Sequence, residues 1–533
     1  MPIVASVVSP SLSRGQRITK PAVRSKAGIV VAQNRCAAEI GARVLKQGGH
    51  AADAAVATAF ALGVVEPWMS GIGGVGAALV HDAGSGKVAA FDFGSASPAA
   101  LDPRDFELAG GTDSDLFGWP SVKGRVNTVG AKAVVAPTEP AGLALLHHRF
   151  GRRKWADLVA PAVRLAAEGP VVDWHTMLVV STAITDLARN PAARARFLRD
   201  GAPPQPPGPT AASPTLRLAM PDLARTLDII AEEGAAALYR GPLARSIAED
   251  MRAMGGYLGE ADLAAVAPAE RTPLEIPYRG RTIHVLPEMN GGPTLAVAFA
   301  DLTRRSVQPP AAIDGAAFAA YAAALRAGWA HRFEVMGDAG ERTAPTSTTH
   351  LAVVDRDGNI VTLTQTLLSL FGSRIVLPGT GILMNNGINW FDPRPGGPNS
   401  LAPGRRGLAN YVPAIMTGGE SVIGIGGCGG RRILPAVFQL LALAADFGLD
   451  LDKALHQPRV DLSGLGPVVA DRRLGDKAIA VLAAASDVVV GEPSVLSNPF
   501  TIASAVRRAG GVNEGATEPA HPWSDAVSED MVD

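Results

Sequence analysis

The chain of 533 residues is nearly neutral, with 49 Lys and Arg against 50 Asp and Glu and a net charge of −1. Its 47% hydrophobic and 19% charged residues are typical of a folded globular protein. The charge balance excludes the electrostatic footprint of a nucleic-acid-binding or membrane-surface protein. We therefore expect no nucleic-acid partner. No stretch is long and apolar enough to cross a bilayer, so we also expect no membrane association.

The N-terminus and the cysteines lead to two further expectations. No basic segment followed by an apolar run marks a secretory signal peptide, so we predict a cytoplasmic protein. Cys36 and Cys428 are the only cysteines of the chain, and no zinc-ligand spacing is visible. Free thiols, no metal and no cofactor are therefore expected, with one long-range disulfide as the alternative.

The first part of the chain alternates between strand and helix patterns. Residues 1–27 are predicted to be an irregular leader, followed by a short strand over 28–33. Two alanine-rich helical segments follow, and the second, AADAAVATAFALGVV, is apolar nearly all round and is expected to be buried. Residues 77–93 show a strand, a Gly-Ser-Gly turn and a second strand.

The middle of the chain is loop-rich over 94–136 and largely helical over 140–265. Strand patterns return over 348–392, and residues 421–448 indicate a strand, a glycine loop and a buried helix. The segment 511–533 holds six acidic residues and no Lys or Arg, and we predict an acidic mobile tail. Strands flanked by buried helices at both ends indicate an α/β (α+β) protein, a four-layered αββα sandwich.

One predicted hairpin concentrates hydroxyl groups. The sequence RDG at 356–358 is typical of a three-residue hairpin turn with glycine in its last position. If the hairpin is centred on this turn, Thr348 lies opposite Thr366, and His350 lies opposite Thr364. Strand alternation places all four side chains on one face.

This cluster permits catalysis by an N-terminal nucleophile. A threonine hydroxyl needs a nearby base, and cleavage of the Ser347–Thr348 bond would free the α-amino group of Thr348, whose unperturbed pKa is about 7.7–8.0. Thr366 could hold the Thr348 hydroxyl in place. The alternative is a purely structural, threonine-rich strand pair.

The glycine loop GIGGCGGRR, residues 424–432, has three interpretations. Its backbone N–H groups could bind a phosphate, but the chain lacks G-x-x-x-x-G-K-[ST]. They could form an oxyanion hole, which suits a threonine nucleophile better. Glycines that only allow close packing are the third interpretation. Cys428 has no neighbouring histidine, which disfavours it as a nucleophile.

Several long motifs in the same order resemble the γ-glutamyltransferase family over nearly the full chain. These are QGGHAADAAVATAFALGVVEPWMSGIGG, TTHLAVVDRDGNIVTLTQT, PGTGILMNN and GCGGRRI. The resemblance implies an N-terminal-nucleophile fold and self-cleavage between Ser347 and Thr348. It gives a large subunit, 1–347, and a small subunit, 348–533, which form one interlocked unit. It further implies that Thr348 rather than Thr349 is the nucleophile, with the supporting residues Thr366, Gly429 and Gly430.

The residues that hold the γ-glutamyl group in this family are replaced in this chain. The family's D-[FY]-R motif ends here in glycine, T-L-N ends in leucine, the acidic residues after the paired asparagines are absent, and the serine pair is lost. The substituted positions are Gly94, Leu368, Gly387, Trp390, Ala409 and Asn410. The expected pocket is more neutral and partly apolar, so the acyl specificity is predicted to differ from γ-glutamyl. Five arginines close to these motifs could compensate: Arg374, Arg405, Arg406, Arg431 and Arg432.

The leading hypothesis is an autoprocessing amidohydrolase or acyltransferase that acts on a small-molecule amide, with water or an amine as acceptor. NNGINWFDP also looks like the cephalosporin-acylase-like branch of the family. The processed subunits could form a further dimer. The alternatives are an ordinary γ-glutamyltransferase or glutathione hydrolase, a non-catalytic relative that binds a small ligand, and a nucleotide-binding protein.

Overall fold

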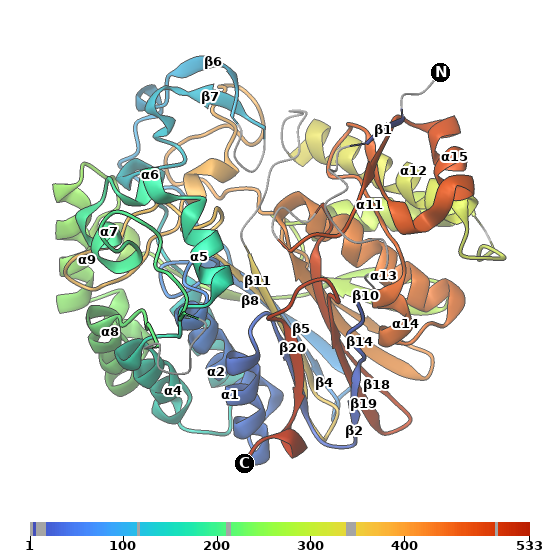
Figure 1. Ribbon diagram of the computed structural model, residues 1–533, viewed down its shortest axis with the longest axis horizontal. Coiled ribbons are helices and arrows are strands. Elements are labelled where there is room, and N and C mark those ends of the chain that lie inside the picture. The colour runs from blue at the N-terminus through green and yellow to red at the C-terminus, as the bar shows by residue number, and fades with distance from the viewer. Residues whose placement is uncertain are drawn as a thin grey trace.

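Two seven-stranded antiparallel sheets form the centre of the molecule (Figure 1). The computed structural model describes residues 4–6, 18–113, 118–208, 215–306, 308–336, 348–495 and 499–533. In spatial order the first sheet contains β20 (Asp525–Ser528), β3 (Ile29–Ala32), β11 (Thr349–Val354), β12 (Ile360–Thr366), β4 (Val75–Asp82), β5 (Lys87–Phe93) and β8 (Ala269–Arg271). The second contains β2 (Val23–Ser25), β19 (Val512–Thr517), β18 (Ile502–Ala509), β14 (Ser421–Cys428), β13 (Ala414–Thr417), β10 (Arg281–Val285) and β9 (Leu274–Tyr278).

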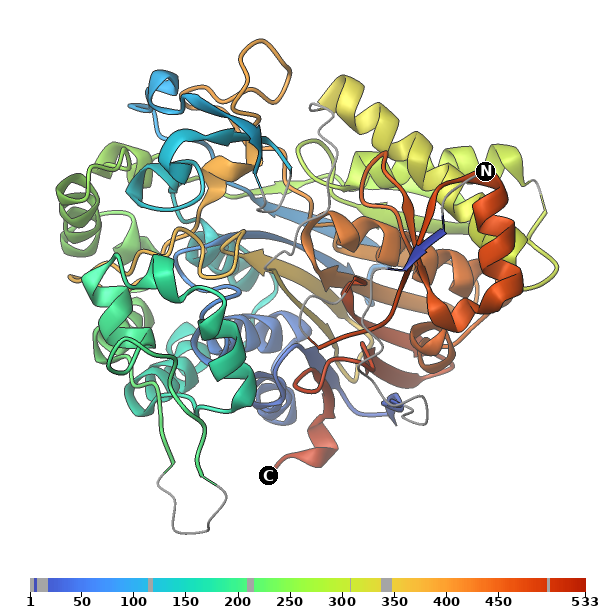
Figure 2. The ribbon, with the colours of Figure 1, turned by 45° about the horizontal axis from the view of Figure 1, so that its top comes forward.

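Helices cover the outer faces of both sheets (Figures 1 and 2). A third cluster of apolar side chains fills the space between the sheets. The first sheet carries α1 (Arg35–Lys46), α2 (Ala51–Val65), α3 (Glu139–Phe150), α4 (Trp155–Glu168), α8 (Pro221–Glu233) and α9 (Pro242–Ala253). The second carries α11 (Gly292–Arg305), α12 (Gly315–His331), α13 (Ile433–Phe447), α14 (Leu451–His456) and α15 (Gly475–Ala485). The predicted αββα sandwich is confirmed.

Smaller elements complete the chain. A four-stranded sheet contains β1 (Val4–Ser6), β17 (Val488–Gly491), β16 (Val468–Asp471) and β15 (Val460–Asp461), and β6 (Leu108–Thr112) pairs with β7 (Pro120–Val122). Short helices within the segment that runs from α3 are α5 (Trp174–Ser181), α6 (Ile184–Leu187), α7 (Pro191–Phe197) and α10 (Glu260–Ala264). Within the described part of the chain, no helix combines the length and the apolarity that a membrane span requires.

The sequence explains why α2 occupies the centre of the first helical layer. Its residues are small and apolar on every side, and almost all of them are buried, as predicted. A capping box starts it, because the His50 side chain accepts from the backbone N–H of Ala52 while the Asp53 carboxylate accepts from the His50 N–H. The helix therefore anchors α1 and α4 around it and supports strands β11 and β12.

Two terminal segments differ from the expectation. The leader, 1–27, is not wholly irregular, because β2 pairs with β19, and β1 pairs with β17. The acidic segment 511–533 is not a mobile tail, because β19 and β20 pair within the two central sheets. The physical reason is that its acids have partners that lie far away in the sequence, and composition does not show such partners.

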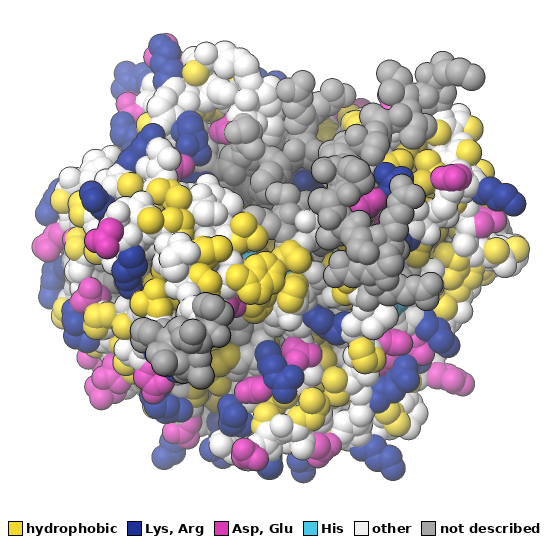
Figure 3. Space-filling model, in the orientation of Figure 1, with side chains coloured by type: hydrophobic (Ala, Val, Ile, Leu, Met, Phe, Trp, Pro, Cys, Tyr) yellow, Lys and Arg dark blue, Asp and Glu magenta, His cyan; other side chains and the backbone are white. Residues whose placement is uncertain are grey.

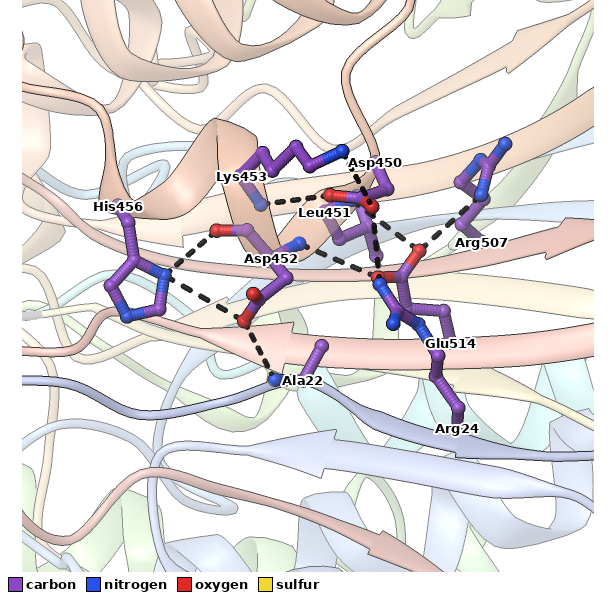
Figure 4. Close-up of polar contacts among 9 residues, drawn as sticks. All are labelled: Ala22, Arg24, Asp450, Leu451, Asp452, Lys453, His456, Arg507 and Glu514. Atoms are coloured by element: carbon purple, nitrogen blue, oxygen red, sulfur yellow. Dashed lines mark hydrogen bonds and ion pairs between the residues drawn. The ribbon is translucent and has the colours of Figure 1, made fainter.

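Figure 4 shows these partners around Glu514 of β19. The carboxylate of Glu514 is buried and pairs with Arg24 of β2 at 3.0 Å and with Arg507 of β18 at 3.4 Å. Asp452 accepts from the backbone N–H of Ala22 at 2.9 Å, which holds the leader against α14. Charge pairs of this kind fasten β2, near the start of the chain, and β19, near its end, to each other and to β18.

Candidate active site

The strand register brings four positions into one row at the end of the first sheet. In the β11–β12 hairpin, His350 pairs with Thr364, as predicted, and continuing this register by two residues places Thr348 opposite Thr366. Thr366 pairs with Val75 of β4, and the β4–β5 register continues to place Val75 opposite Gly94. Adjacent strands lie about 4.8 Å apart, so Gly94 is roughly 14 Å from Thr348 across three strand spacings.

Thr348 and Thr366 form a buried hydroxyl pair. Their Oγ1 atoms lie 3.5 Å apart, and the side chains are 5% and 2% exposed. Thr366 Oγ1 accepts from the backbone N–H of Leu368 at 2.8 Å. Because a hydroxyl has one proton to donate, this contact orients the Thr366 hydroxyl so that it can donate to Thr348. Ser347, on the other side of the predicted cut, lies outside the described residues.

His350 is the nearest histidine in sequence, and its surroundings exclude it as the base. Its Nδ1 lies 2.9 Å from Thr364 Oγ1 and its Nε2 lies 3.1 Å from Thr362 Oγ1. The ring is fully buried against Gly426, where an added Cβ would lie 2.3 Å from it. Burial lowers the pKa of His350 to about 3. It is therefore a neutral packing residue at working pH, which leaves the α-amine of Thr348 as the candidate base.

The glycine loop lies beside the nucleophile. Strand β14 ends at Cys428, whose sulfur accepts a hydrogen bond from the backbone N–H of Thr348. Gly429 follows with φ 146° and Gly430 with φ 57°, and α13 begins three residues later. The φ of Gly429 falls in a region that is essentially restricted to glycine. The loop is therefore an unusual backbone turn that adjoins Thr348.

Both cysteines are free, as expected, and Cys428 is an inert thiol. Burial raises its pKa to about 12, so it is neutral at working pH. This agrees with the prediction from the sequence, in which the lack of a neighbouring histidine disfavours Cys428 as a nucleophile. Among the described residues, no cluster of three or more His, Cys, Asp or Glu side chains could hold a metal ion.

Comparison with known proteins identifies the family. The family model described as gamma-glutamyltranspeptidase matches residues 37–346 and 321–527. The chain belongs to this family. It is 33% identical over 523 residues to the acylase ACY 1 proenzyme of Pseudomonas sp. (strain V22), covering 91% of each chain. It is 30% identical over 488 residues to the glutathione hydrolase proenzyme of Escherichia coli (strain K12), covering 82% of this chain and 81% of that relative.

A solved structure gives the same assignment. The cephalosporin acylase of Bacillus halodurans matches 98% of this chain and 99% of its own, with a TM-score of 0.81 and 26% identity. The relatives are named as acylases and glutathione hydrolases, which cleave amides. This member of the γ-glutamyltranspeptidase family is therefore an amide-cleaving enzyme with the N-terminal-nucleophile fold.

At the first position where the chain departs from the family pattern, an arginine from another loop fills the space. An added Cβ on Gly94 would lie 2.9 Å from the Arg406 guanidinium and 2.9 Å from the Tyr411 hydroxyl. Arg406 donates to both carboxylate oxygens of Asp92 at 2.8 and 2.7 Å. One of the five candidate arginines therefore lies where the family's arginine would begin, but its charge is already paired.

Side chains also occupy the space beside the residues that follow the paired asparagines. A Cβ on Gly387 would lie 2.4 Å from Val135 and 3.0 Å from the Trp390 ring. Trp390, Leu368 and Ala409 belong to the apolar cluster between the two sheets, which also contains Trp119 and Tyr411. Leu368 keeps a left-handed φ of 81°, a conformation that asparagine adopts more readily than leucine. The backbone at Leu368 therefore has the conformation that asparagine favours, while the side chain is apolar.

Arg332 is a site residue that sequence reasoning missed. It is buried at the end of α12, and its guanidinium donates to the Ala409 carbonyl at 2.7 Å and to Asn410 Oδ1 at 2.9 Å. Asn410 is therefore tied to Arg332 and is not an isolated replacement for a serine. No local sequence pattern marks Arg332, because the pair joins positions that lie 78 residues apart.

The other candidate arginines have structural surroundings. Arg374 is buried and donates to the backbone carbonyls of Thr128 and Gly372. Arg431 lies against the rings of Trp119, Trp329 and Phe333, and burial lowers its pKa to about 10. Arg405 is exposed and Arg432 is half-buried. Of the five arginines, Arg406 is the one whose guanidinium lies beside Gly94, the position at which the family has its arginine.

Two buried acids near the site were also missed. Glu139 starts α3 behind Gly74, and the backbone N–H of Gly71 is the polar group that faces its buried carboxyl. Burial raises the pKa of Glu139 to about 8 and that of Glu66 to about 8. Both carboxyls are therefore largely protonated in the folded protein near neutral pH.

We expect Glu139→Gln to change the pH dependence of stability. Glu139 ionises in the unfolded chain above about pH 4.3 but in the folded chain only near pH 8. Between these values the unfolded chain binds fewer protons, so folding stability falls as pH rises. Glutamine does not titrate, so the variant should gain Tm relative to wild type between about pH 5 and about pH 8. Thermal melts check this, with the exposed Glu232→Gln as the control, and a constant Tm difference would contradict it.

Proposed function

We propose that the chain is an autoprocessing N-terminal-threonine amidohydrolase or acyltransferase whose acyl group is not γ-glutamyl. Cleavage of the Ser347–Thr348 bond would give fragments of 347 and 186 residues from the chain of 533. Thr348 would then be the nucleophile, its α-amine the base, and Thr366 the residue that positions the hydroxyl. The backbone N–H groups of Gly429 and Gly430 would form the oxyanion hole.

The proposed reaction has two steps. The Thr348 hydroxyl oxygen bonds to the acyl carbon of the amide, its proton passes to the α-amine, and the same proton then passes to the departing amine. Water, or an acceptor amine, attacks the resulting ester and gives a proton to the α-amine. That proton returns to the Thr348 oxygen as the acyl product leaves. Proton transfer of this kind suits a base with a pKa near the working pH.

One observation supports the altered acyl specificity: this chain's own side chains fill the family's head-group site. Arg406 fills the space at Gly94, Val135 and Trp390 fill the space at Gly387, and Arg332 binds Asn410. Losing a bidentate arginine clamp alone costs a few kcal/mol of binding. An acyl group that lacks the paired α-amino and α-carboxylate groups suits the apolar cluster of Leu368, Trp390 and Ala409 better.

A panel of p-nitroanilides tests this specificity. We expect kcat/KM for straight-chain apolar acyl groups to exceed that for γ-glutamyl at least about 10-fold, because the filled site removes roughly 1.4 kcal/mol or more of γ-glutamyl binding. The purified, self-cleaved protein is assayed, with Thr348→Ala as the blank. A preference for γ-glutamyl would support the alternative, an ordinary glutathione hydrolase. The absence of both cleavage and turnover would support a non-catalytic relative.

Several finer points stay predictions. Assembly of the two fragments as one unit, and a further dimer of these units, are testable by size-exclusion chromatography with light scattering. The balance between water and an amine as acceptor is measurable by adding free amines to the assay. The cytoplasmic location is testable by cell fractionation.

A further inference from the structure

The backbone nitrogen of Thr348 lies in a polar corner that the proposed mechanism has not used. In the uncut chain its N–H donates to Cys428 Sγ, and the side-chain carboxamide of Gln33 adjoins the same sulfur. Gln33 follows β3 and is fully buried. The nucleophile's nitrogen and the Gln33 carboxamide therefore meet at one sulfur atom.

The strand register places Gln33 on the correct face for this contact. Strand β3 pairs with β11 so that Val31 lies opposite Ala352. Continuing that register by two residues places Gln33 opposite His350, on the face that His350 shares with Thr348. Diagonal neighbours on one face lie about 7–8 Å apart, which is within reach of a long side chain.

The Gln33 carboxamide is unusual because it is unsatisfied. Among the residues that the structure describes, neither its oxygen nor its nitrogen has a conventional hydrogen-bond partner. Leaving a buried polar group unpaired costs about 1–3 kcal/mol, and such groups in native structures call for an explanation. A partner that forms only after self-cleavage would supply one.

Self-cleavage creates such a partner at this place. Hydrolysis of the Ser347–Thr348 bond leaves a carboxylate on Ser347 and adds hydrogen to the Thr348 nitrogen, which becomes an amine. The peptide nitrogen has one N–H, whereas the neutral amine has two and the ammonium has three. The new N–H groups need acceptors, and the amine's lone pair must still face the Thr348 hydroxyl.

We infer that Gln33 and Cys428 are positioning residues that hold the α-amine of the mature enzyme, Gln33 through its carboxamide oxygen and Cys428 through its sulfur. This inference rests on the proposed function, because the amine exists only after cleavage. Two fixed acceptors bind the N–H groups and direct the lone pair toward the hydroxyl proton. Neither residue touches the substrate.

Other titratable groups surround this corner and enter any pH argument. Glu66, at the end of α2, is close enough that its charge raises the pKa of the Cys428 thiol, and its Oε1 has no partner among the described residues. His350 from β11 is neutral, because burial lowers its pKa to about 3. Glu139 lies beside Gly74, which also adjoins the Thr366 carbonyl. Of these groups, Glu66 is the one whose charge acts on the Cys428 sulfur.

Glu66 also connects this corner to a cavity of about 250 Å³ whose lining includes Trp68, His175 and Trp523. The His175 and Trp523 rings stack at 3.9 Å between centroids. Hydrophobic side chains gather on the surface over α5, where Trp174 is 47% exposed (Figure 3). Glu66 lines this cavity and has a pKa of about 8, close to that of an α-amine. Any measurement must therefore separate the ionisation of Glu66 from that of the Thr348 amine.

The test is the acid limb of the pH profile of kcat/KM, which reports the pKa of the base in the free enzyme. Gln33→Glu places a carboxylate beside the amine, which favours the ammonium. The limb should therefore move to higher pH by about 1 unit or more. Gln33→Leu removes an acceptor and should lower kcat about 10-fold with KM nearly unchanged, moving the limb to lower pH. Both variants should still self-cleave, since neither polar atom of the Gln33 carboxamide has a conventional hydrogen-bond partner among the described residues of the uncut chain.

The matched controls separate positioning from packing. Gln439→Leu removes another fully buried glutamine. The side-chain amide of Gln439 donates to the backbone carbonyls of Pro435 in α13 and Val460 in β15. It should lower stability without moving the limb. Glu66→Gln shows whether the limb belongs to Glu66. Cys428→Ala should lower kcat, and Cys36→Ser, at the other free cysteine, should not.

A readout that does not depend on turnover completes the test. Labelling the protein with nitrogen-15 threonine marks the Thr348 amine of the mature protein and leaves its N–H groups intact, and its NMR titration should shift in Gln33→Glu in the same direction as the acid limb. An unmoved titration in a folded, self-cleaved variant overturns the inference, and so does a folded Gln33 variant that fails to cleave. A wild-type chain that never cleaves removes the amine and overturns the proposed function as well.

Discussion

Thr348→Ala is expected to leave the protein as one uncut chain of 533 residues without amidase activity. The substitution removes the hydroxyl that lies 3.5 Å from Thr366 Oγ1, which is the group proposed to attack both its own peptide bond and the substrate. Loss of a nucleophile lowers turnover by roughly 10⁴-fold or more. The fold should persist, since alanine fits where threonine was and the register of the hairpin is set by other residues.

Intact-mass spectrometry and substrate turnover check this expectation. Wild type should give two masses that correspond to 347 and 186 residues, which together make up the chain of 533. Thr348→Ser, which keeps a hydroxyl, should still cleave, and Thr349→Ala is the control for the neighbouring threonine. If Thr348→Ala cleaved normally, the nucleophile would have to lie elsewhere. A wild-type chain that stays uncut would contradict the autoprocessing mechanism.

The core of this site could be predicted because its geometry is local. A three-residue turn and the two-residue period of a strand suffice to place Thr348 opposite Thr366, and the structure keeps this register. The glycine loop was recognisable for a similar reason, because only glycine adopts the φ of 146° at Gly429 without strain. Short-range rules therefore placed Thr348 opposite Thr366 and marked the glycine loop, whereas the family resemblance assigned their roles.

The rest of the site depends on contacts that no local pattern records. Arg406 reaches Asp92 from 314 positions away, and Arg332 reaches Asn410 from 78 positions away. The sequence showed that the family's charged residues were missing, but only the structure shows what fills their places. The same limit explains the error over 511–533, whose acids looked unpaired until Glu514 was found between Arg24 and Arg507.

Substituting Gly429 is the second change with a large expected effect. In Gly429→Ala, the alanine backbone would have to adopt φ 146° and ψ 23°. Its methyl group would lie 3.2 Å from Thr501 Oγ1. Such strain costs about 1–3 kcal/mol, and the backbone can relieve it by rotating the peptide that joins Gly429 to Gly430. This rotation would turn the Gly430 N–H away from the developing oxyanion. Since losing one donor lowers kcat by about 10²–10³-fold, we expect a loss of that size.

Three glycine variants separate this effect from general instability. Gly430→Ala should lose less, because φ 57° is accessible to alanine at modest cost. Gly466→Ala is the control, since nothing lies within 4 Å of its added methyl group. Each variant is assayed for self-cleavage, Tm and kcat. The oxyanion assignment requires that kcat is highest in Gly466→Ala, lower in Gly430→Ala and lowest in Gly429→Ala, while KM stays within a few fold of wild type. A self-cleaved Gly429→Ala enzyme with wild-type kcat would mean that the oxyanion is stabilised by other donors.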